Sequence, residues 1–144
     1  MEKIHIIKGE IFEDFRGRIN SINNFHFEGI KRCYLIHHPD SSIIRGWHGH
    51  QNERKWFYCV KGDFKIALVK IDDWNNPSNE LKPHIYDIND KDSQLICVPS
   101  GYANCIKTNT DGSILLVLSD KTLEEAVEDS WRYDKSMWVD WSKL

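Results

Sequence analysis

The fold is decided by residues 55–71, which read Lys-Trp-Phe-Tyr-Cys-Val-Lys-Gly-Asp-Phe-Lys-Ile-Ala-Leu-Val-Lys-Ile. Two β-rich runs, 55–61 and 63–71, flank Gly62, and this arrangement resembles a hairpin. In the second run large apolar residues alternate with Lys65, Ala67 and Val69. That alternation predicts a strand packed on one face and partly covered on the other.

Outward from this stretch, the chain continues as short β-rich runs separated by turn residues. About nine or ten short strands can be counted, as in a sandwich or barrel. A single helix is expected late in the chain, at 122–129, with Thr122 as N-cap and Glu125 completing a capping box. A parallel α/β fold would need crossover helices, which the pattern lacks. The sequence therefore predicts an all-β sandwich or closed barrel with one short C-terminal helical segment.

Size and composition narrow the class of protein. The chain has 144 residues, enough for one domain spanning 1–144, and its 40% hydrophobic content excludes disorder. The net charge of −3 and the lack of a basic stripe argue against nucleic acid and anionic membranes as partners. No apolar run suggests a membrane span or a signal peptide, so we expect a cytoplasmic protein. We take the terminal match to a peroxisomal address, residues 142–144, as coincidence. The four cysteines are predicted to be buried free thiols.

The richest chemistry lies in the stretch Arg-Gly-Trp-His-Gly-His at 45–50. On a strand, His48 and His50 would project to the same face. Three interpretations are open from the spacing alone. The pair could ligate a metal with further ligands, one imidazole could act as a general base, or both could be satisfied structural histidines.

The motif resembles the cupin superfamily, in which His-x-His on a strand is followed by a glycine and later by Pro-x-Gly. Metal-binding cupins add a glutamate four or five positions on and a further histidine after Pro-x-Gly. Here Glu53 follows His50 too closely, and Asn104 stands at the last position. The resemblance therefore implies neither a catalytic metal nor another cofactor.

A closer resemblance is to the sugar-nucleotide branch of the cupins, the dTDP-4-dehydrorhamnose 3,5-epimerases. Five of their motifs occur here in order: Asp14-Phe15-Arg16-Gly17, Arg45-Gly46-Trp47-His48, Lys55 to Gly62, Val98-Pro99-Ser100-Gly101-Tyr102-Ala103-Asn104, and Tyr133-Asp134 through Asp140-Trp141. The chain is also similar to the dTDP-sugar 3,4-ketoisomerases, through Arg32-Cys33-Tyr34-Leu35-Ile36 and the second histidine, His50. It stands between the two groups.

The resemblance implies a role for each matching residue. Both groups begin by removing a proton from a carbon next to a sugar ketone, with His48 as the base and Asp134 holding its far nitrogen. Lys55 and Arg45 would stabilise the enolate oxygen. Substrate binding would involve Arg16, whose guanidinium suits a diphosphate, together with Arg45, Asn104 and the rings of Tyr34 or Trp47.

Three departures from the epimerase pattern bear on the reaction. Leu116 aligns with the tyrosine that reprotonates the opposite face, Asn104 replaces a histidine, and a glutamate after the 14–17 turn is missing. These departures put double epimerisation in doubt. A single epimerisation or a 3,4-keto shift needs only His48 and a second donor such as His50 or Tyr34.

We therefore expect a homodimeric cupin isomerase that acts on a nucleotide-linked 4-keto-6-deoxyhexose in deoxysugar or cell-surface polysaccharide biosynthesis. Activity of the 3(,5)-epimerase type ranks first and 3,4-ketoisomerase second. A sugar-nucleotide-binding cupin without activity is the alternative of another class.

Overall fold

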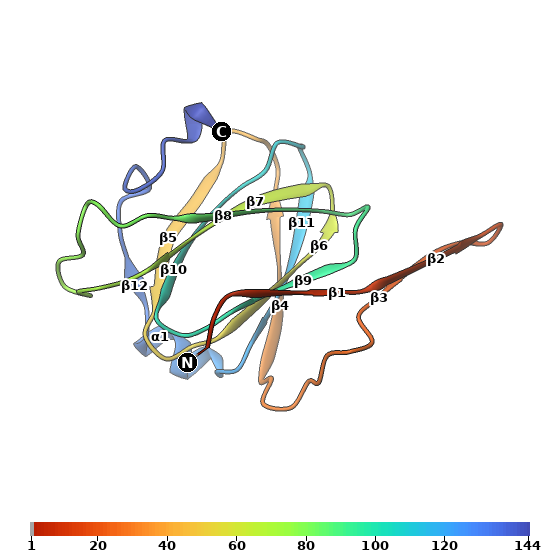
Figure 1. Cartoon of the computed structure of the whole chain (residues 1–144), viewed down its shortest axis with the longest axis horizontal. Coiled ribbons are helices and arrows are strands. Elements are labelled where there is room, and N and C mark those ends of the chain that lie inside the picture. Colours follow the sequence, from red (N-terminus) through yellow and green to blue (C-terminus); the bar gives the residue numbers. More distant parts are fainter. Residues whose placement is uncertain (1) are drawn as a thin grey trace.

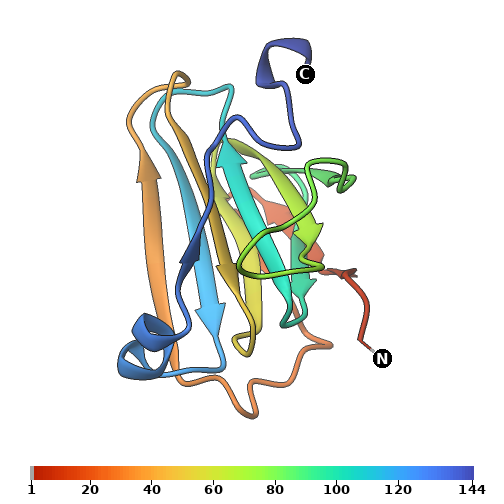
Figure 2. The same cartoon turned by 90° about the vertical axis from the view of Figure 1, so that its left-hand side faces the viewer.

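The computed structural model describes residues 2–144 and shows two antiparallel five-stranded sheets packed face to face (Figure 2). The first sheet has the order β1 (His5–Lys8), β9 (Gln94–Val98), β6 (Lys55–Lys61), β11 (Ser113–Ser119) and β4 (Arg32–His38). The second has the order β12 (Trp131–Arg132), β5 (Ile44–His50), β10 (Tyr102–Lys107), β7 (Asp63–Lys70) and β8 (His84–Asn89). The all-β prediction is confirmed.

Residues 55–71 cross from one sheet to the other instead of forming a hairpin. β6 pairs with β11 and β9, whereas β7 pairs with β10 and β8. Gly62 makes the corner with a φ of 79°, and a Cβ there would overlap the side chain of Ser113. The hairpin prediction was wrong because a glycine between two strands also permits a turn from one packed sheet into the next.

Both faces of β7 are covered, as its alternation predicted. Phe64, Ile66 and Leu68 belong to the interior cluster between the sheets. Ala67 and Val69 belong to a second cluster, in which the C-terminal segment 133–141 covers the outer face of the second sheet. Within residues 2–144, no comparable segment covers the whole outer face of the first sheet, where Val60 is 48% exposed.

The predicted helical segment is present as α1 (Leu123–Glu128). Thr122 Oγ1 accepts a hydrogen bond from the backbone N–H of Glu125, and the Glu125 carboxylate accepts one from the N–H of Thr122. This capping box satisfies donors that the helix itself leaves unpaired. A 3₁₀ turn, η1 (Trp141–Lys143), closes the chain.

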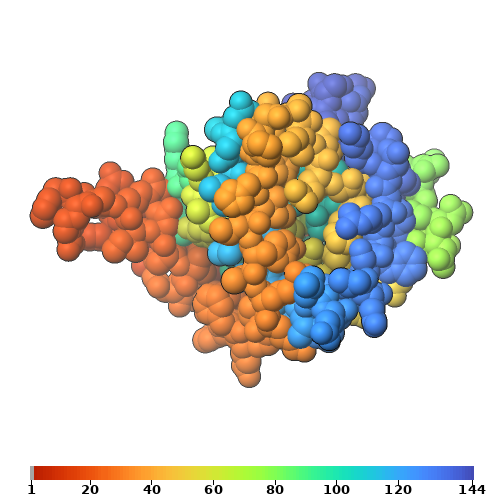
Figure 3. Space-filling view, turned by 180° about the vertical axis from the view of Figure 1, so that it is seen from behind, coloured from red at the N-terminus to blue at the C-terminus, as the bar shows by residue number. Residues whose placement is uncertain are grey.

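A two-stranded ribbon of β2 (Glu10–Asp14) and β3 (Gly17–Ser21) stands apart from the two sheets. It projects from the body as an arm (Figures 1 and 3). Apolar side chains along it are exposed, with Phe12 at 57% and Phe15 at 97%. The ribbon is tied to the body by the Arg18 guanidinium, which donates to the carbonyl oxygens of Asp90 and Lys91.

All four cysteines are free, and three are buried as predicted. Cys33 is exposed, because it lies on β4, an edge strand with alternating burial. Among residues 2–144 no helix is long and apolar enough to cross a membrane.

Candidate active site

A cavity of about 450 Å³ opens into the space between the two sheets, beside α1. Its walls come from β4, β5, β6 and β10, and from the segment that follows α1. Six of the predicted site residues line it: Tyr34, Arg45, His48, His50, Lys55 and Asn104. The lining residues that were not predicted include Arg32, Ser130 and Arg132.

A bulge in β5 determines which of its side chains reach the cavity. Asn104 pairs with His48, but the next residue, Cys105, pairs with Gly46, so Trp47 is the extra residue on β5. The irregularity puts Arg45 opposite Ile106, a member of the interior cluster. Simple alternation would place Arg45 and His48 on opposite faces, and the bulge brings them to the same one.

The two histidines lie side by side, with 4.3 Å between their ring centroids. His48 Nε2 is hydrogen-bonded to Ser130 Oγ at 2.7 Å. His50 Nδ1 donates to the backbone carbonyl of Asp129 at 2.9 Å, because a carbonyl oxygen can only accept. His50 Nε2 is buried without a hydrogen-bond partner. In the neutral ring this nitrogen carries a lone pair, as a proton acceptor requires.

Burial, followed by the neighbouring His50 and the Lys55 ammonium, lowers the pKa of His48 to about 3. Burial and then Lys55 likewise lower the pKa of His50 to about 4. Both imidazoles are therefore neutral at pH 7 and able to accept a proton.

Cationic groups surround the pair. Burial lowers the pKa of Lys55 to about 8, so this ammonium is mostly charged at neutral pH but near its titration range. The Arg32 guanidinium lies 4.8 Å from the centroid of the Tyr34 ring. Burial raises the pKa of Tyr34 to about 12, which keeps its hydroxyl a donor. The pocket can thus receive negative charge that develops on a bound molecule.

Three predicted site residues lie outside the cavity. Trp47 is 1% exposed on the opposite face of β5, where its Nε1–H donates to the carbonyl of Met137 at 2.8 Å. The Asp134 carboxylate accepts hydrogen bonds from Ser136, and Ser130 occupies the place beside His48 that was expected for it. Arg16 lies at the tip of the arm and pairs with Asp14.

Leu116 also faces away from the cavity. It pairs with Leu35 on one side and Tyr58 on the other, while its neighbours Leu115 and Val117 belong to the interior cluster. The inward positions of β11 beside Leu116 are thus apolar, and no proton donor stands there.

Glu53 and Asp129 were not predicted as site residues. The Glu53 side chain is fully buried, with Oε1 3.0 Å from His50 Nδ1 and Oε2 3.0 Å from Arg32 Nη2. The Asp129 carboxylate accepts from the backbone N–H groups of residues 51–53. In the sequence, Glu53 was considered only as a metal ligand, and its spacing from His50 did not fit that role. Asp129 was missed because it directly follows α1 and reaches the site only in the folded protein. Among residues 2–144, no group of three or more His, Cys, Asp and Glu side chains could hold a metal ion.

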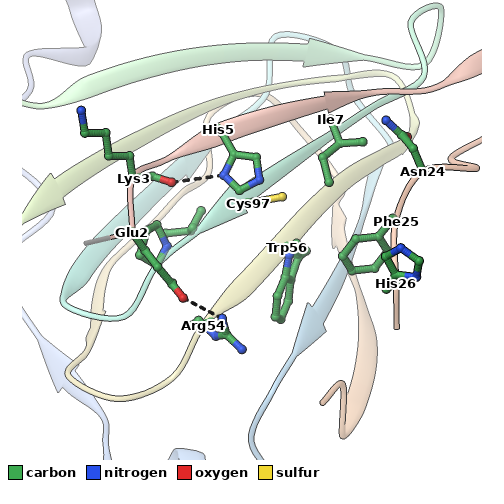
Figure 4. Close-up of a pocket in the computed structure, with 12 residues that line it drawn as sticks. Glu2, Lys3, His5, Ile7, Asn24, Phe25, His26, Arg54, Trp56 and Cys97 are labelled. Atoms are coloured by element: carbon green, nitrogen blue, oxygen red, sulfur yellow. Dashed lines mark hydrogen bonds and ion pairs between the residues drawn. The ribbon is translucent and has the colours of Figure 1, made fainter. Parts of the chain in front are cut away.

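A second hollow of about 390 Å³ lies between β1, β9, β6 and the segment 24–26 (Figure 4). Trp56 and Cys97 point into it, and an ion pair in its wall joins Glu2 to Arg54. Its histidines, His5 and His26, come from separate segments and form no pair comparable with that of the first cavity. The histidine pair therefore makes the first cavity the candidate active site.

Two packed antiparallel sheets with a histidine pair in a cationic interior pocket are the architecture of a cupin. The chain belongs to the WxcM-like, C-terminal family, FdtA, whose model matches residues 2–138. The family resemblance drawn from the sequence is confirmed. Comparison with the curated proteins gives no match.

Solved structures with the same fold include both groups that the sequence resembles. One is the 3,4-ketoisomerase QdtA from Thermoanaerobacterium thermosaccharolyticum, a histidine-to-asparagine mutant in complex with TDP-4-keto-6-deoxyglucose. It is 27% identical with a TM-score of 0.72, over 92% of this chain and 89% of that one. A dTDP-4-dehydrorhamnose 3,5-epimerase from Bacillus anthracis with TDP and PPi bound is 15% identical, with a TM-score of 0.77 over 96% and 84%. A 3,4-ketoisomerase from Helicobacter canadensis is 18% identical, with a TM-score of 0.71 over 92% of each chain.

Proposed function

We propose that this protein is a 3,4-ketoisomerase of a nucleotide-linked 4-keto-6-deoxyhexose. The observation that carries the proposal is the neutral histidine pair, His48 and His50, placed side by side in a cationic pocket. The wider class, an isomerase or epimerase of nucleotide sugars, was predicted from the sequence and is confirmed by the family and its relatives.

The reaction moves two protons and needs no net oxidant. A base removes the proton from C3 of the sugar, and the electron pair of that bond forms a C3–C4 double bond while the C4 ketone becomes an enolate oxygen. The proton on the C3 hydroxyl leaves as a ketone forms at C3, and protons are delivered to C4 and to the C4 oxygen. Two neutral imidazoles allow one ring to serve the carbon atoms and the other the oxygen atoms.

The same pocket supplies what the enolate needs. Lys55, Arg45 and Arg132 line it, and a cation close to the developing oxyanion stabilises it more in a buried site than in water. We assign His48 as the base on carbon, with His50 as the second proton carrier. Tyr34 and Asn104 provide polar contacts to the sugar hydroxyls.

Epimerisation at C3 is the second candidate, since it begins with removal of the same C3 proton and the fold is shared with an epimerase. The sequence ranked this activity first. We now rank it second, because the inward positions of β11 on either side of Leu116 are Leu115 and Val117, which provide no acid on the opposite face.

NMR of dTDP-4-keto-6-deoxyglucose incubated with the protein in heavy water tests the proposal. We expect a product with the ketone at C3. A product with inverted C3 and the ketone still at C4 would favour the epimerase. If no deuterium enters the sugar while the nucleotide still binds in a titration, the protein is a sugar-nucleotide-binding cupin without this activity.

We infer that the protein works as a homodimer, with the β2–β3 arm against the second copy. An isolated two-stranded ribbon is only marginally stable in water, and this one exposes Phe12, Phe15 and Ile19. Arg16, at the tip of the projecting arm, is not among the residues that line its own cavity, so we infer that it serves the pocket of the second copy. Sedimentation of the wild type should give a dimer. Phe12→Asp should give a monomer, whereas a wild-type monomer would contradict the inference.

The cytoplasmic location, the absence of a metal requirement and a role in deoxysugar or polysaccharide biosynthesis stay predictions from the sequence. Prolonged dialysis against a chelator should leave the isomerisation rate unchanged, measured by the same NMR assay. A loss of rate that added divalent metal restores would contradict metal independence.

A further inference from the structure

The carboxylate of Glu53 lies against the Nδ1 edge of His50, yet it has no role in the proposed reaction. Its side chain is fully buried, which is rare for a glutamate unless its charge is paired. We propose that Glu53 is the positioning residue of His50: it holds the Nδ1–H tautomer and stabilises the imidazolium that forms when Nε2 accepts a proton. This inference rests on the proposed function for its kinetic part only.

Contacts at both carboxylate oxygens carry the proposal. Oε2 accepts from the Ser119 hydroxyl and from Arg32 Nη2, and these bonds fix the group from β11 and β4. Oε1 has no hydrogen bond of good geometry, but it lies 3.0 Å from His50 Nδ1. The charge therefore faces the imidazole edge that Asp129 O also contacts.

The two acceptors at one ring edge determine the tautomer. A carbonyl oxygen and a carboxylate both require a donor, so Nδ1 keeps its proton and Nε2 stays a lone pair. Nε2 is buried without a partner and belongs to a ring that lines the cavity. When it accepts a proton, the ring becomes a cation beside the Glu53 carboxylate, and the two charges attract in a buried site.

Other charges around His50 act in both directions. On β6 and β4, the cations Lys55 and Arg32 disfavour a charged ring, and Arg132 on β12 adds to the cationic lining. His48 is the neighbouring ring on the same strand. The carboxylates of Asp129 and Glu53 oppose these cations, but the Asp129 carboxylate is already bound by three backbone N–H groups. Glu53 is thus the carboxylate placed to respond to protonation of the ring.

The experiment is an NMR titration of the His50 imidazole nitrogens in the free protein, with His50→Asn used to assign the signals. In the wild type we expect the Nδ1–H tautomer. In Glu53→Gln, which keeps the shape but removes the charge, we expect the titration midpoint of His50 to fall and its Nδ1–H proton signal to move upfield. Unchanged signals in a folded variant would overturn the proposal.

Asp120→Asn is the matched control. Asp120 is a carboxylate on a nearby segment that pairs with Arg54 and not with a histidine. Its substitution should leave the His50 signals unchanged. If Glu53→Gln does not fold, Glu53→Asp decides, since it keeps the charge but withdraws it from Nδ1. A partial shift supports the proposal, and no shift overturns it.

Kinetics give a second readout. We expect Glu53→Gln to lower kcat about tenfold or more at unchanged KM, because the imidazolium exists only after proton transfer. A rise in KM with kcat unchanged would overturn the assignment. The titration uses no substrate, so a His50 shift in a protein without isomerase activity would support the role of Glu53 and reject the proposed function.

Discussion

Adjacent residues of strand β5 serve different purposes on its two faces: those on one face line the cavity, and those on the other pack into a hydrophobic cluster. The inward face presents Arg45, His48 and His50 to the cavity, and it leaves His50 Nε2 without a partner. The outward face packs Trp47 under the C-terminal segment and satisfies its N–H at the Met137 carbonyl. A buried polar group without a partner, such as His50 Nε2, lowers the free energy of unfolding. The close packing of Trp47 on the outward face raises it and so offsets this loss.

Two glycines of β5 lie very close to neighbouring groups. A Cβ at Gly49 would lie 2.8 Å from the Trp74 ring, and one at Gly46 would lie 2.6 Å from the Asn104 carbonyl. Glycine therefore lets the outward face sit close to its neighbours. Substitutions on the inward face should alter activity, and those on the outward face should alter the free energy of unfolding.

The largest effect is expected for His48→Ala. Loss of the base should lower the isomerisation rate by about 10²–10⁴-fold, while the nucleotide still binds and the free energy of unfolding changes little. Deuterium exchange at C3 and a nucleotide titration on the same sample measure both quantities. Persistent exchange in this variant would show that His48 is not the base.

Trp47→Ala should produce the opposite result. Removal of this buried indole should cost about 3–5 kcal/mol of unfolding free energy, measured by denaturant titration. At a temperature where the variant is folded, its C3 exchange should stay close to that of the wild type. Trp47→Phe, which loses mainly the hydrogen bond to Met137, should cost about 1 kcal/mol. A selective loss of activity in a stable Trp47→Ala would mean that the two faces are not independent.

The pH dependence should sharpen the description of the inward face. The histidine pKa values near 4 and 3 mean that the base stays neutral down to mildly acidic pH, so kcat/KM should fall only as the pH drops through about 4. Because an unfolded histidine binds its proton near 6.5, stability should already decline as the pH falls from about 6.5 toward 4. Above about pH 8 the rate should fall as Lys55 loses its charge. An acid limb near 6.5 would contradict a buried base.

The smallest effect is expected for Asp134→Asn. The Asp134 carboxylate accepts from the hydroxyl and the backbone N–H of Ser136 in its own turn, and these hydrogen bonds hold its pKa below the usual range. We expect the C3 exchange rate to change less than about twofold. A loss of rate comparable with that of His48→Ala would restore the role that the family resemblance suggested.

Several features of this protein were determined by the sequence itself. The two-residue alternation in β7, the capping box at Thr122 and the common face of His48 and His50 are local patterns that need no knowledge of distant contacts. The ordered motifs likewise identified the family correctly.

Only the tertiary structure decided the rest, because the pairing of distant strands leaves no local pattern. Gly62 turns between two sheets instead of closing a hairpin, and the bulge that moves Arg45 to the inward face exists only against β10. Ser130 reaches His48 across 82 positions, and Asp129 reaches His50 across 79. The sequence alone identified the histidine pair and part of the cationic lining. The tertiary structure was needed to identify Ser130, Asp129 and Glu53, the groups that contact the two rings.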